Sequence, residues 1–193
     1  MLSEKLSKYH IILASGSPRR QQFLKELNLS FEIKLKDTDE KYPKHLKGAE
    51  IATYLAVLKA NSFKNELKNN DLLITADTIV WSEEKSLAKA NNKEEAVKML
   101  QELSGKKHEV ISACCITTNQ FQQVFYETTK VQFKELSAEE IEFYVNNFEP
   151  FDKAGSYGIQ EWIGYIGIEK IEGSFFNVMG FPIFKFYKTL SEL

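Results

Sequence analysis

The chain has 193 residues, of which 43% are hydrophobic and 27% charged, and its formal net charge is −2 at pH 7. This is enough chain for one domain, or for two small lobes around one core. Bulk charge does not draw such a chain to DNA or to a membrane surface, so any bound anion must meet a local cluster of cations. The first ten residues have no apolar signal core and no run reaches the ~20 residues of a membrane span, which predicts a cytoplasmic protein.

Hydrophobic periodicity predicts alternating strands and helices along most of the chain. In chain order we expect a strand at 9–15, a helix after Pro18, a strand at 30–37, a helix at 49–67, a strand at 71–77, a strand, turn and short return at 78–90, a helix at 92–105, a β-hairpin at 108–133, a helix at 137–148, and a strand and closing helix after a glycine-rich loop. Ser137 and Glu140 have the spacing of a capping box, and Gly105 ends the preceding helix. The helix at 49–67 is expected to bury Ile51, Tyr54, Leu55 and Leu58.

Strand–helix units mixed with a β-hairpin are typical of an α/β protein with a mixed sheet and helices on its faces. The strand ends and the loops beside them would then form a crevice. The two cysteines, Cys114 and Cys115, are neighbours in a predicted strand and point to opposite faces. We therefore expect buried free thiols and no disulfide between them.

The stretch LASGSPRR at 13–20 forms the corner between the first predicted strand and helix. Free backbone N–H groups at a helix start, the hydroxyls of Ser15 and Ser17 and the charges of Arg19 and Arg20 together favour a phosphate. The alternative is a solvated helix start with ordinary surface arginines, and this stretch alone does not decide between them. The Walker A pattern is absent, which excludes a P-loop site.

Asp77 ends the predicted buried strand DLLITAD, where a carboxylate is costly unless it meets a metal, a base or a substrate. It suits a divalent-cation ligand or a proton acceptor for water, and the alternative is a turn cap. Asp37, Asp39 and Glu40 indicate either oxygen ligands for Mg²⁺ or Mn²⁺ or a solvated acidic loop.

The stretch EPFDKAGSYGIQ at 149–160 is a constrained, glycine-rich loop that ends in Gln160. A glutamine amide offers a donor and an acceptor, so it can pair with the edge of a nucleobase; the alternative is a turn with an incidental glutamine. Lys59 and Lys89 follow apolar patterns and either reach into the crevice or lie on the surface. The three histidines lie far apart, so nothing supports a histidine-based nucleophile mechanism.

Together these stretches resemble the Maf family of nucleoside triphosphate pyrophosphatases. The resemblance covers nearly the whole chain, which matches in order SGSPRR, YLAVLKA, ADTIV, EEAVKMLQELSGKKHEV, TTKVQF, DKAGSYGIQ and EGSFFNVMGFPI. It implies a single Maf-like domain over residues 1–193, with two lobes around one active-site cleft. The implied fold is α/β, with an elongated mixed sheet flanked by helices and a central cleft, similar to the inosine triphosphatase fold.

Within the family, DKAGSYGIQ resembles the branch that acts on dTTP and UTP. The resemblance implies a metal-dependent enzyme that hydrolyses these nucleotides, with modified pyrimidine nucleotides as further candidates, to the monophosphate and pyrophosphate. Asp77 matches the proposed proton acceptor and, with Glu40, would hold one or two Mg²⁺ or Mn²⁺ ions. The family positions tied to base preference correspond to Arg19, Thr78 and Gln160. Those that form the polar lining of the cleft correspond to Ser15, Arg20, Glu40, Lys59 and Lys89.

Three features depart from the family pattern. Ala90 follows Lys89 where a proline is usual, the hairpin SEEKS at 82–86 lacks the glycine often present before that lysine, and Glu161 follows Gln160 where a glycine is frequent. These departures affect the role of Lys89 and the shape and charge of the cleft edge beside Gln160.

A second hypothesis, from a different class, is a nucleotide-binding regulator of cell division with little turnover, because Maf proteins have been linked to septum formation. A pure binder has no need of a buried acid at Asp77, which favours the enzyme. The expected partners are a nucleoside triphosphate and, as in many family members, a second copy of the chain. Neither nucleic acid nor a membrane is expected as a partner.

Overall fold

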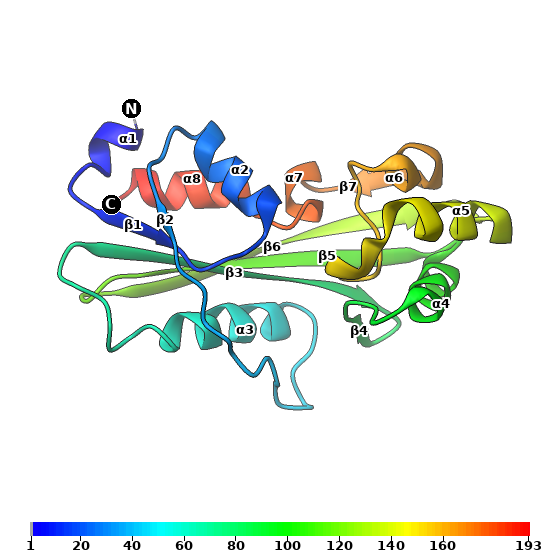
Figure 1. Cartoon of the computed structure of the whole chain (residues 1–193), viewed down its shortest axis with the longest axis horizontal. Helices are drawn as coiled ribbons and strands as arrows, with labels where there is room; N and C mark the ends of the chain where they lie inside the picture. Colours follow the sequence, from blue (N-terminus) through cyan, green and yellow to red (C-terminus); the bar gives the residue numbers. More distant parts are fainter. Residues whose placement is uncertain (1) are drawn as a thin grey trace. The chain divides into compact units, whose positions relative to one another are not determined.

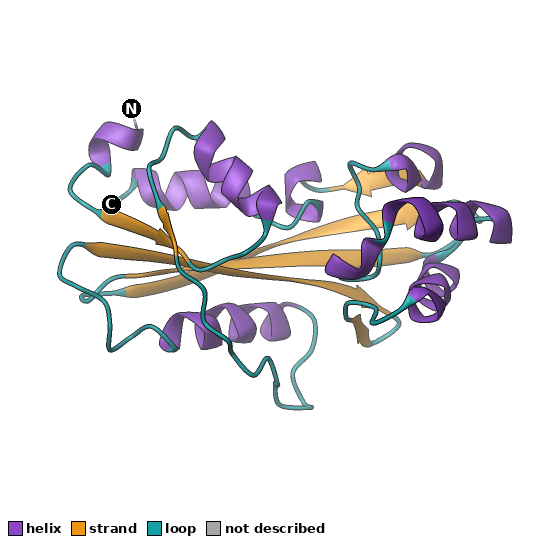
Figure 2. Cartoon of the chain, viewed as in Figure 1, coloured by secondary structure: helices purple, strands orange, loops and turns teal. Residues whose placement is uncertain are grey.

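The computed structural model describes residues 2–193 (Figures 1 and 2). The strands are β1 (His10–Leu13), β2 (Glu32–Ile33), β3 (Asp71–Ser82), β4 (Lys85–Leu87), β5 (Lys107–Thr117), β6 (Gln122–Phe133) and β7 (Ile168–Glu172). The helices are α1 (Leu2–Lys5), α2 (Pro18–Glu26), α3 (Ala49–Asn61), α4 (Lys93–Leu103), α5 (Ala138–Phe148), α6 (Trp162–Gly167), α7 (Phe175–Val178) and α8 (Ile183–Ser191), and a short 3-10 helix spans Pro150–Asp152.

The strands form one mixed sheet. Its order is β2-β1-β3-β5-β6-β7, and β4 pairs with β3 outside this path. β1 is parallel to both β2 and β3, whereas the β3–β4 and β6–β7 pairs are antiparallel. The predicted α/β class with a mixed sheet and flanking helices is therefore confirmed.

The chain divides into two compact units. The first comprises Met1–Asp77, Ser112–Glu127 and Gly180–Leu193, and the second comprises Thr78–Ile111 and Thr128–Met179. β3, β5 and β6 each contribute residues to both units. The single domain expected over the whole chain stays a prediction.

The first unit has helices on both faces of its strands. α2 and α8 cover one face and α3 covers the other (Figure 1). Its core is aliphatic around Leu13 and Leu24 and aromatic near α8, where Phe181 stacks on Phe23 with 6.2 Å between ring centroids. Cys114 and Cys115 are buried and free in this unit, as predicted.

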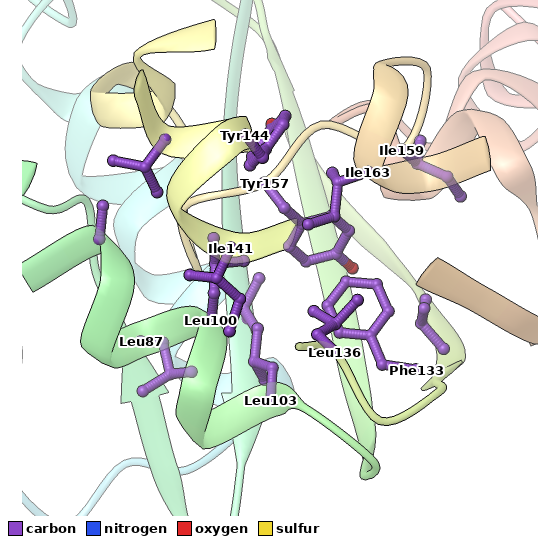
Figure 3. Close-up of a cluster of buried hydrophobic side chains, with 14 of the residues drawn as sticks. Leu87, Leu100, Leu103, Phe133, Leu136, Ile141, Tyr144, Tyr157, Ile159 and Ile163 are labelled. Carbon is purple, nitrogen blue, oxygen red and sulfur yellow. The ribbon is translucent and has the colours of Figure 1, made fainter. Parts of the chain in front are cut away.

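The second unit has its own core, drawn in Figure 3. The buried side chains that form it include Leu100, Leu103, Phe133, Ile141, Tyr144, Tyr157 and Ile163. The predicted capping box opens α5, because Ser137 Oγ accepts from the N–H of Glu140 and the Glu140 carboxylate accepts from the N–H of Ser137. Within residues 2–193, no helix combines the length and the apolar character that crossing a membrane requires.

Two predicted elements are shorter in the structure than expected, and the helix α6 lies outside the predicted ones. The strand expected at 30–37 is reduced to the two residues of β2. Both are exposed, so extending the strand pairing would bury little further apolar surface. The helix expected at 49–67 ends at Asn61, and Tyr54 on it is 38% exposed instead of buried. α6 was not predicted, because its glycines at 164 and 167 argue against a helix.

His108 gives the second unit a titratable group in its core. Its Nε2 lies 2.7 Å from the Tyr157 hydroxyl, and its ring packs edge-on against Phe133. Burial lowers the pKa of His108 from 6.5 to about 4. As the pH falls, the unfolded chain therefore binds the proton before the folded chain does. The stability that comes from burying the neutral imidazole is complete above pH 6.5 and is lost towards pH 4.

We expect His108 to lower the free energy of unfolding by about 1.4 kcal/mol for each pH unit below its unfolded pKa, and by about 3 kcal/mol in all. Urea unfolding from about pH 7 to pH 5 measures this slope in wild type and in His108→Gln, which lacks the ionisation. His45→Gln, at an exposed position, is the control and should keep the wild-type slope. A wild-type slope in His108→Gln would show that another group titrates.

Candidate active site

Arg20 lies in the first turn of α2 and joins three segments of the first unit. Its Nε donates to the Gly180 carbonyl at 3.0 Å, and its Nη1 donates to the Ala76 carbonyl at 2.8 Å and to the Ser15 hydroxyl at 3.3 Å. Burial lowers the pKa of Arg20, and the charge of Asp77 opposes that shift. A desolvated cation is therefore held at the helix start by backbone carbonyls of β3 and of the segment before α8.

α2 begins at this corner for local reasons. Ser17 is the N-cap in extended backbone, and Pro18 takes the first helical position, where its missing N–H costs nothing. The Ser17 side chain makes no capping hydrogen bond. The backbone N–H of Ser17 instead donates to Ser15 Oγ at 3.3 Å. Arg19 is half-buried beside Arg20. A helix start without a side-chain cap and with two arginines suits an anion.

Lys59, Asp77 and Glu40 form the second cluster of the first unit. The Lys59 ammonium donates to Asp77 Oδ1 and lies 3.0 Å from Glu40 Oε1. Lys59 comes from the last turn of α3, Asp77 from β3, and Glu40 from the loop at 34–48, which contains neither helix nor strand (Figure 2). One ammonium group thus lies between two carboxylates from separate parts of the chain.

The α3–β3 packing explains how Lys59 meets Asp77. Thr75 Oγ1, which is buried, donates to the Ala56 carbonyl of α3 at 2.7 Å. Side chains two residues apart on a strand share a face, so Asp77 points to the same side as Thr75. Lys59 lies three residues after Ala56, almost one helical turn further along. The Thr75 hydrogen bond therefore fixes the register that brings the ammonium to the carboxylate.

Asp77 does not end a strand, so that part of the sequence interpretation was wrong. β3 runs through it to Ser82, because the β-branched and aromatic run after Asp77 continues the ladder. The side chain is nonetheless buried, with the residue 7% exposed. Burial raises the pKa of Asp77, while the neighbouring charges of Lys59 and Arg20 lower it. The result is a carboxylate more basic than one in water.

A divalent cation fits this donor set. Glu40 and Asp77 supply the hard oxygen ligands that Mg²⁺ and Mn²⁺ prefer, and both already contact a cationic group, the Lys59 ammonium. In residues 2–193 no three or more His, Cys, Asp or Glu side chains come together in a way that could hold a metal ion. A metal on these two carboxylates would therefore complete its shell with water and substrate phosphate oxygens.

Thr78, Lys89 and Gln160 belong to the second unit. Thr78 is half-buried on β3, and Lys89 is exposed while its backbone pairs with Ala154. Gln160 is half-buried, and its Oε1 is buried with no hydrogen-bond partner among the residues that the structure describes. A buried amide oxygen without a donor is costly and indicates a place for a ligand N–H.

Three polar residues near Gln160 have partners that the sequence does not predict. Lys153, Glu161 and Tyr144 form one connected network in the second unit. The sequence predicts Glu161 as a charge at the cleft edge but does not predict its partners. Tyr144 lies on α5, in another element and 17 positions before Glu161, and no periodic pattern links them. The carbonyls of Ala76 and Gly180 that hold Arg20 carry no side-chain signal at all.

The chain was compared with known proteins. The Maf-like protein family matches residues 10–193. A dTTP/UTP pyrophosphatase of Flavobacterium johnsoniae is 54% identical over 193 residues, which covers 100% of both chains. Proteins of the same name from Christiangramia forsetii and Bacteroides thetaiotaomicron are 54% and 49% identical, over 100% and 97% of this chain and 98% of each relative.

Solved structures are similar to this chain in part. The structure of the Staphylococcus aureus Ham1 protein matches with a TM-score of 0.49 and 16% identity, over 64% of this chain and 71% of that chain. A likeness of that size carries no argument about function. The fold class therefore rests on the sheet topology of this chain.

Proposed function

The chain belongs to the Maf family, and from this premise we propose that it is a nucleoside triphosphate pyrophosphatase that hydrolyses dTTP and UTP to the monophosphate and pyrophosphate. The relatives named above, which carry the name dTTP/UTP pyrophosphatase, support this substrate class. The observation that carries the proposal is the buried carboxylate of Asp77, which pairs with Lys59 and whose pKa the charge of Arg20 also lowers. A protein that only binds nucleotides gains nothing from such a basic, buried carboxylate.

In the proposed reaction, water attacks the α-phosphorus and the bond to the bridging oxygen of pyrophosphate breaks. The Asp77 carboxylate accepts the proton of that water, a role that its raised pKa favours. Arg19, Arg20, Lys89 and the amides at the start of α2 bind the negative phosphates, with Ser15 as a further donor. Lys59 orients Asp77 and offers its charge to the phosphates.

Glu40 and Asp77 are the residues that would hold Mg²⁺ or Mn²⁺. When bound there, a divalent ion supplies charge neutralisation of the phosphoryl oxygens. Glu40 is exposed on its loop, so it can adjust to such an ion more freely than Asp77. Thr78 and Gln160 are assigned to the nucleobase. The cleft, the cytoplasmic location and the homodimer expected from the sequence stay predictions.

The test is the position of bond cleavage. Purified protein with Mn²⁺ and UTP should release UMP and pyrophosphate, separated by anion exchange. In H₂¹⁸O, attack at the α-phosphorus places the label in UMP, whereas attack at the β-phosphorus places it in pyrophosphate. UDP and orthophosphate as main products would contradict the proposal. No pyrophosphate at high enzyme concentration would favour the regulator of cell division.

Gln160→Ala should lose base preference more than it loses turnover on the best substrate. Uracil and thymine present an acceptor at O4 beside a donor at N3, and the buried Gln160 Oε1 can accept from N3–H. Cytosine reverses both groups. We expect wild type to have a higher kcat/KM for UTP than for CTP, because a site whose polar groups would stay unpaired rejects the wrong base. In the variant the UTP-to-CTP ratio of kcat/KM should fall. The measurement is kcat/KM for both nucleotides in both proteins, and an unchanged ratio would show that Gln160 does not read the base.

A further inference from the structure

An amide side chain discriminates uracil from cytosine only if it is held in one orientation. A freely turning glutamine can exchange its oxygen and nitrogen and so satisfy either base. Base choice through Gln160 therefore requires neighbours that fix this part of the chain. The structure shows such neighbours on both sides of the residue.

Tyr144 of α5 holds the turn that precedes Gln160. Its hydroxyl accepts from the N–H of Gly158 at 3.0 Å and donates to Glu161 Oε2. Burial, together with the Glu161 charge, raises the pKa of Tyr144, which keeps the phenol protonated as that donor. Tyr144 is 0% exposed and lies in the same core as Tyr157 and Ile163 (Figure 3). One hydroxyl thus binds residues on both sides of Gln160.

Glu161 is fixed at its second oxygen as well. Glu161 Oε1 lies 3.1 Å from the ammonium of Lys153, which also contacts Asp152 Oδ1 at 2.6 Å. The Lys153 side chain is only 10% exposed and that of Glu161 20%, so water screens this pair weakly. The carboxylate therefore connects the start of the glycine-rich loop to its end.

The turn at 158–161 closes on this carboxylate. The N–H of Glu161 donates to the Gly158 carbonyl at 3.0 Å, and a Cβ at Gly158 would lie 2.7 Å from Glu161 Cδ. Ile159 is buried, and the Tyr165 hydroxyl donates to the Gln160 carbonyl at 2.9 Å. The backbone at Gln160 is thus held from both sides, while its amide oxygen is left for a ligand.

From these contacts we infer that Tyr144 and Glu161 are positioning residues for base selection, which act through Gln160 by fixing the backbone from which its amide reaches a 4-oxo pyrimidine. This inference rests on the proposed function for the nature of the ligand. It gives Glu161, which departs from the pattern expected for the family, a role in holding the glycine-rich loop at 149–160. Lys153 holds the Glu161 carboxylate in place through their ion pair.

The test is a double-mutant cycle on binding, with α,β-methylene-UTP and α,β-methylene-CTP as non-hydrolysed probes. Isothermal titration calorimetry gives both dissociation constants for wild type, Tyr144→Phe, Gln160→Ala and the double variant. We expect Tyr144→Phe to lower the CTP-to-UTP ratio of dissociation constants roughly fivefold to tenfold, the value of one buried hydrogen bond. In the Gln160→Ala background the same change should leave the ratio unmoved, because the two residues act as one unit.

Glu161→Gln is the second variant, in case Tyr144→Phe does not fold, and it should lower the ratio in the same way. Glu140→Gln is its matched control, since the Glu140 carboxylate also pairs with a lysine, Lys134 at 2.7 Å, and accepts one further hydrogen bond, from the N–H of Ser137 at 2.9 Å. It should change the unfolding midpoint and not the ratio.

Three outcomes overturn the inference: an unchanged ratio in a folded Tyr144→Phe or Glu161→Gln, an equal fall in the Gln160→Ala background, or no preference in wild type. Because the cycle is measured on binding, it is independent of turnover. A wild type that binds with preference but releases no pyrophosphate overturns the proposed function and leaves this inference standing.

Discussion

Asp77→Asn is expected to lower kcat/KM for UTP by roughly 10²–10⁴ and to leave the fold intact. Asparagine keeps the volume of the side chain but loses the charge that accepts the proton of water. Because burial raises the pKa of Asp77, its ionised form costs the folded state stability at neutral pH, where the unfolded chain keeps the carboxylate charged freely. The variant lacks this cost, so its urea midpoint should equal or exceed that of wild type. Steady-state kinetics and urea unfolding on the same preparation check both expectations.

Asp39→Asn is the control for Asp77→Asn. Asp39 is exposed on the loop at 34–48 and pairs with Lys41 at 2.8 Å, so the same chemical change there should leave both kcat/KM and stability near wild type. A folded Asp77→Asn protein with near-normal turnover would mean that another group takes the proton. A variant that unfolds would contradict the stability argument instead.

Lys59→Met should lower kcat/KM at neutral pH by roughly 10²–10³ and should also shift the pH–rate profile. Lys59 is the nearest cation to Asp77 and lowers its pKa, so its loss raises that pKa further. Catalysis needs the deprotonated carboxylate, and the acid limb of the profile therefore moves to higher pH. Part of the lost activity should return as the pH is raised. The measurement is log kcat/KM against pH for both proteins.

Lys36→Met provides the matched control for Lys59→Met. Lys36 pairs with Glu66, whose side chain is 62% exposed, in the same unit. Loss of this surface ion pair should cost at most about 1 kcal/mol of stability and should not move the profile. A Lys59→Met protein that loses activity with an unmoved acid limb would show that Lys59 acts on the phosphates and not through Asp77.

The corner at 13–20 was predictable because all of its signals are local. An N-cap serine, a proline at the first helical position and two arginines lie within a few residues, and backbone geometry follows from them. The capping box of α5 was predictable for the same reason. The extent of β3 was not predictable. The residues before and after Asp77 fit one long strand as well as two short ones, and only their pairing in the sheet decides between these.

The contacts that define the candidate site depend on tertiary packing. Lys59 meets Asp77 because the Thr75 hydroxyl fixes α3 against β3, and no spacing in the sequence encodes that register. The network of Tyr144 with Glu161 likewise joins a helix to a loop. The sequence therefore predicted candidate residues for the chemistry, while the partners of Lys59, Asp77 and Glu161 came only from the structure.

The chain passes between the two units four times, after Asp77, Ile111, Glu127 and Met179. Neither unit is a continuous stretch, so neither can be expressed as a recombinant fragment or released by a single proteolytic cut. A nonsense mutation at Gly180 would remove a carbonyl partner of Arg20, 160 positions earlier in the chain. For the same reason, one genetic crossover between relatives cannot exchange a whole unit. A crossover between Lys89 and Gln160 would instead separate Gln160 from the residues assigned to the phosphates.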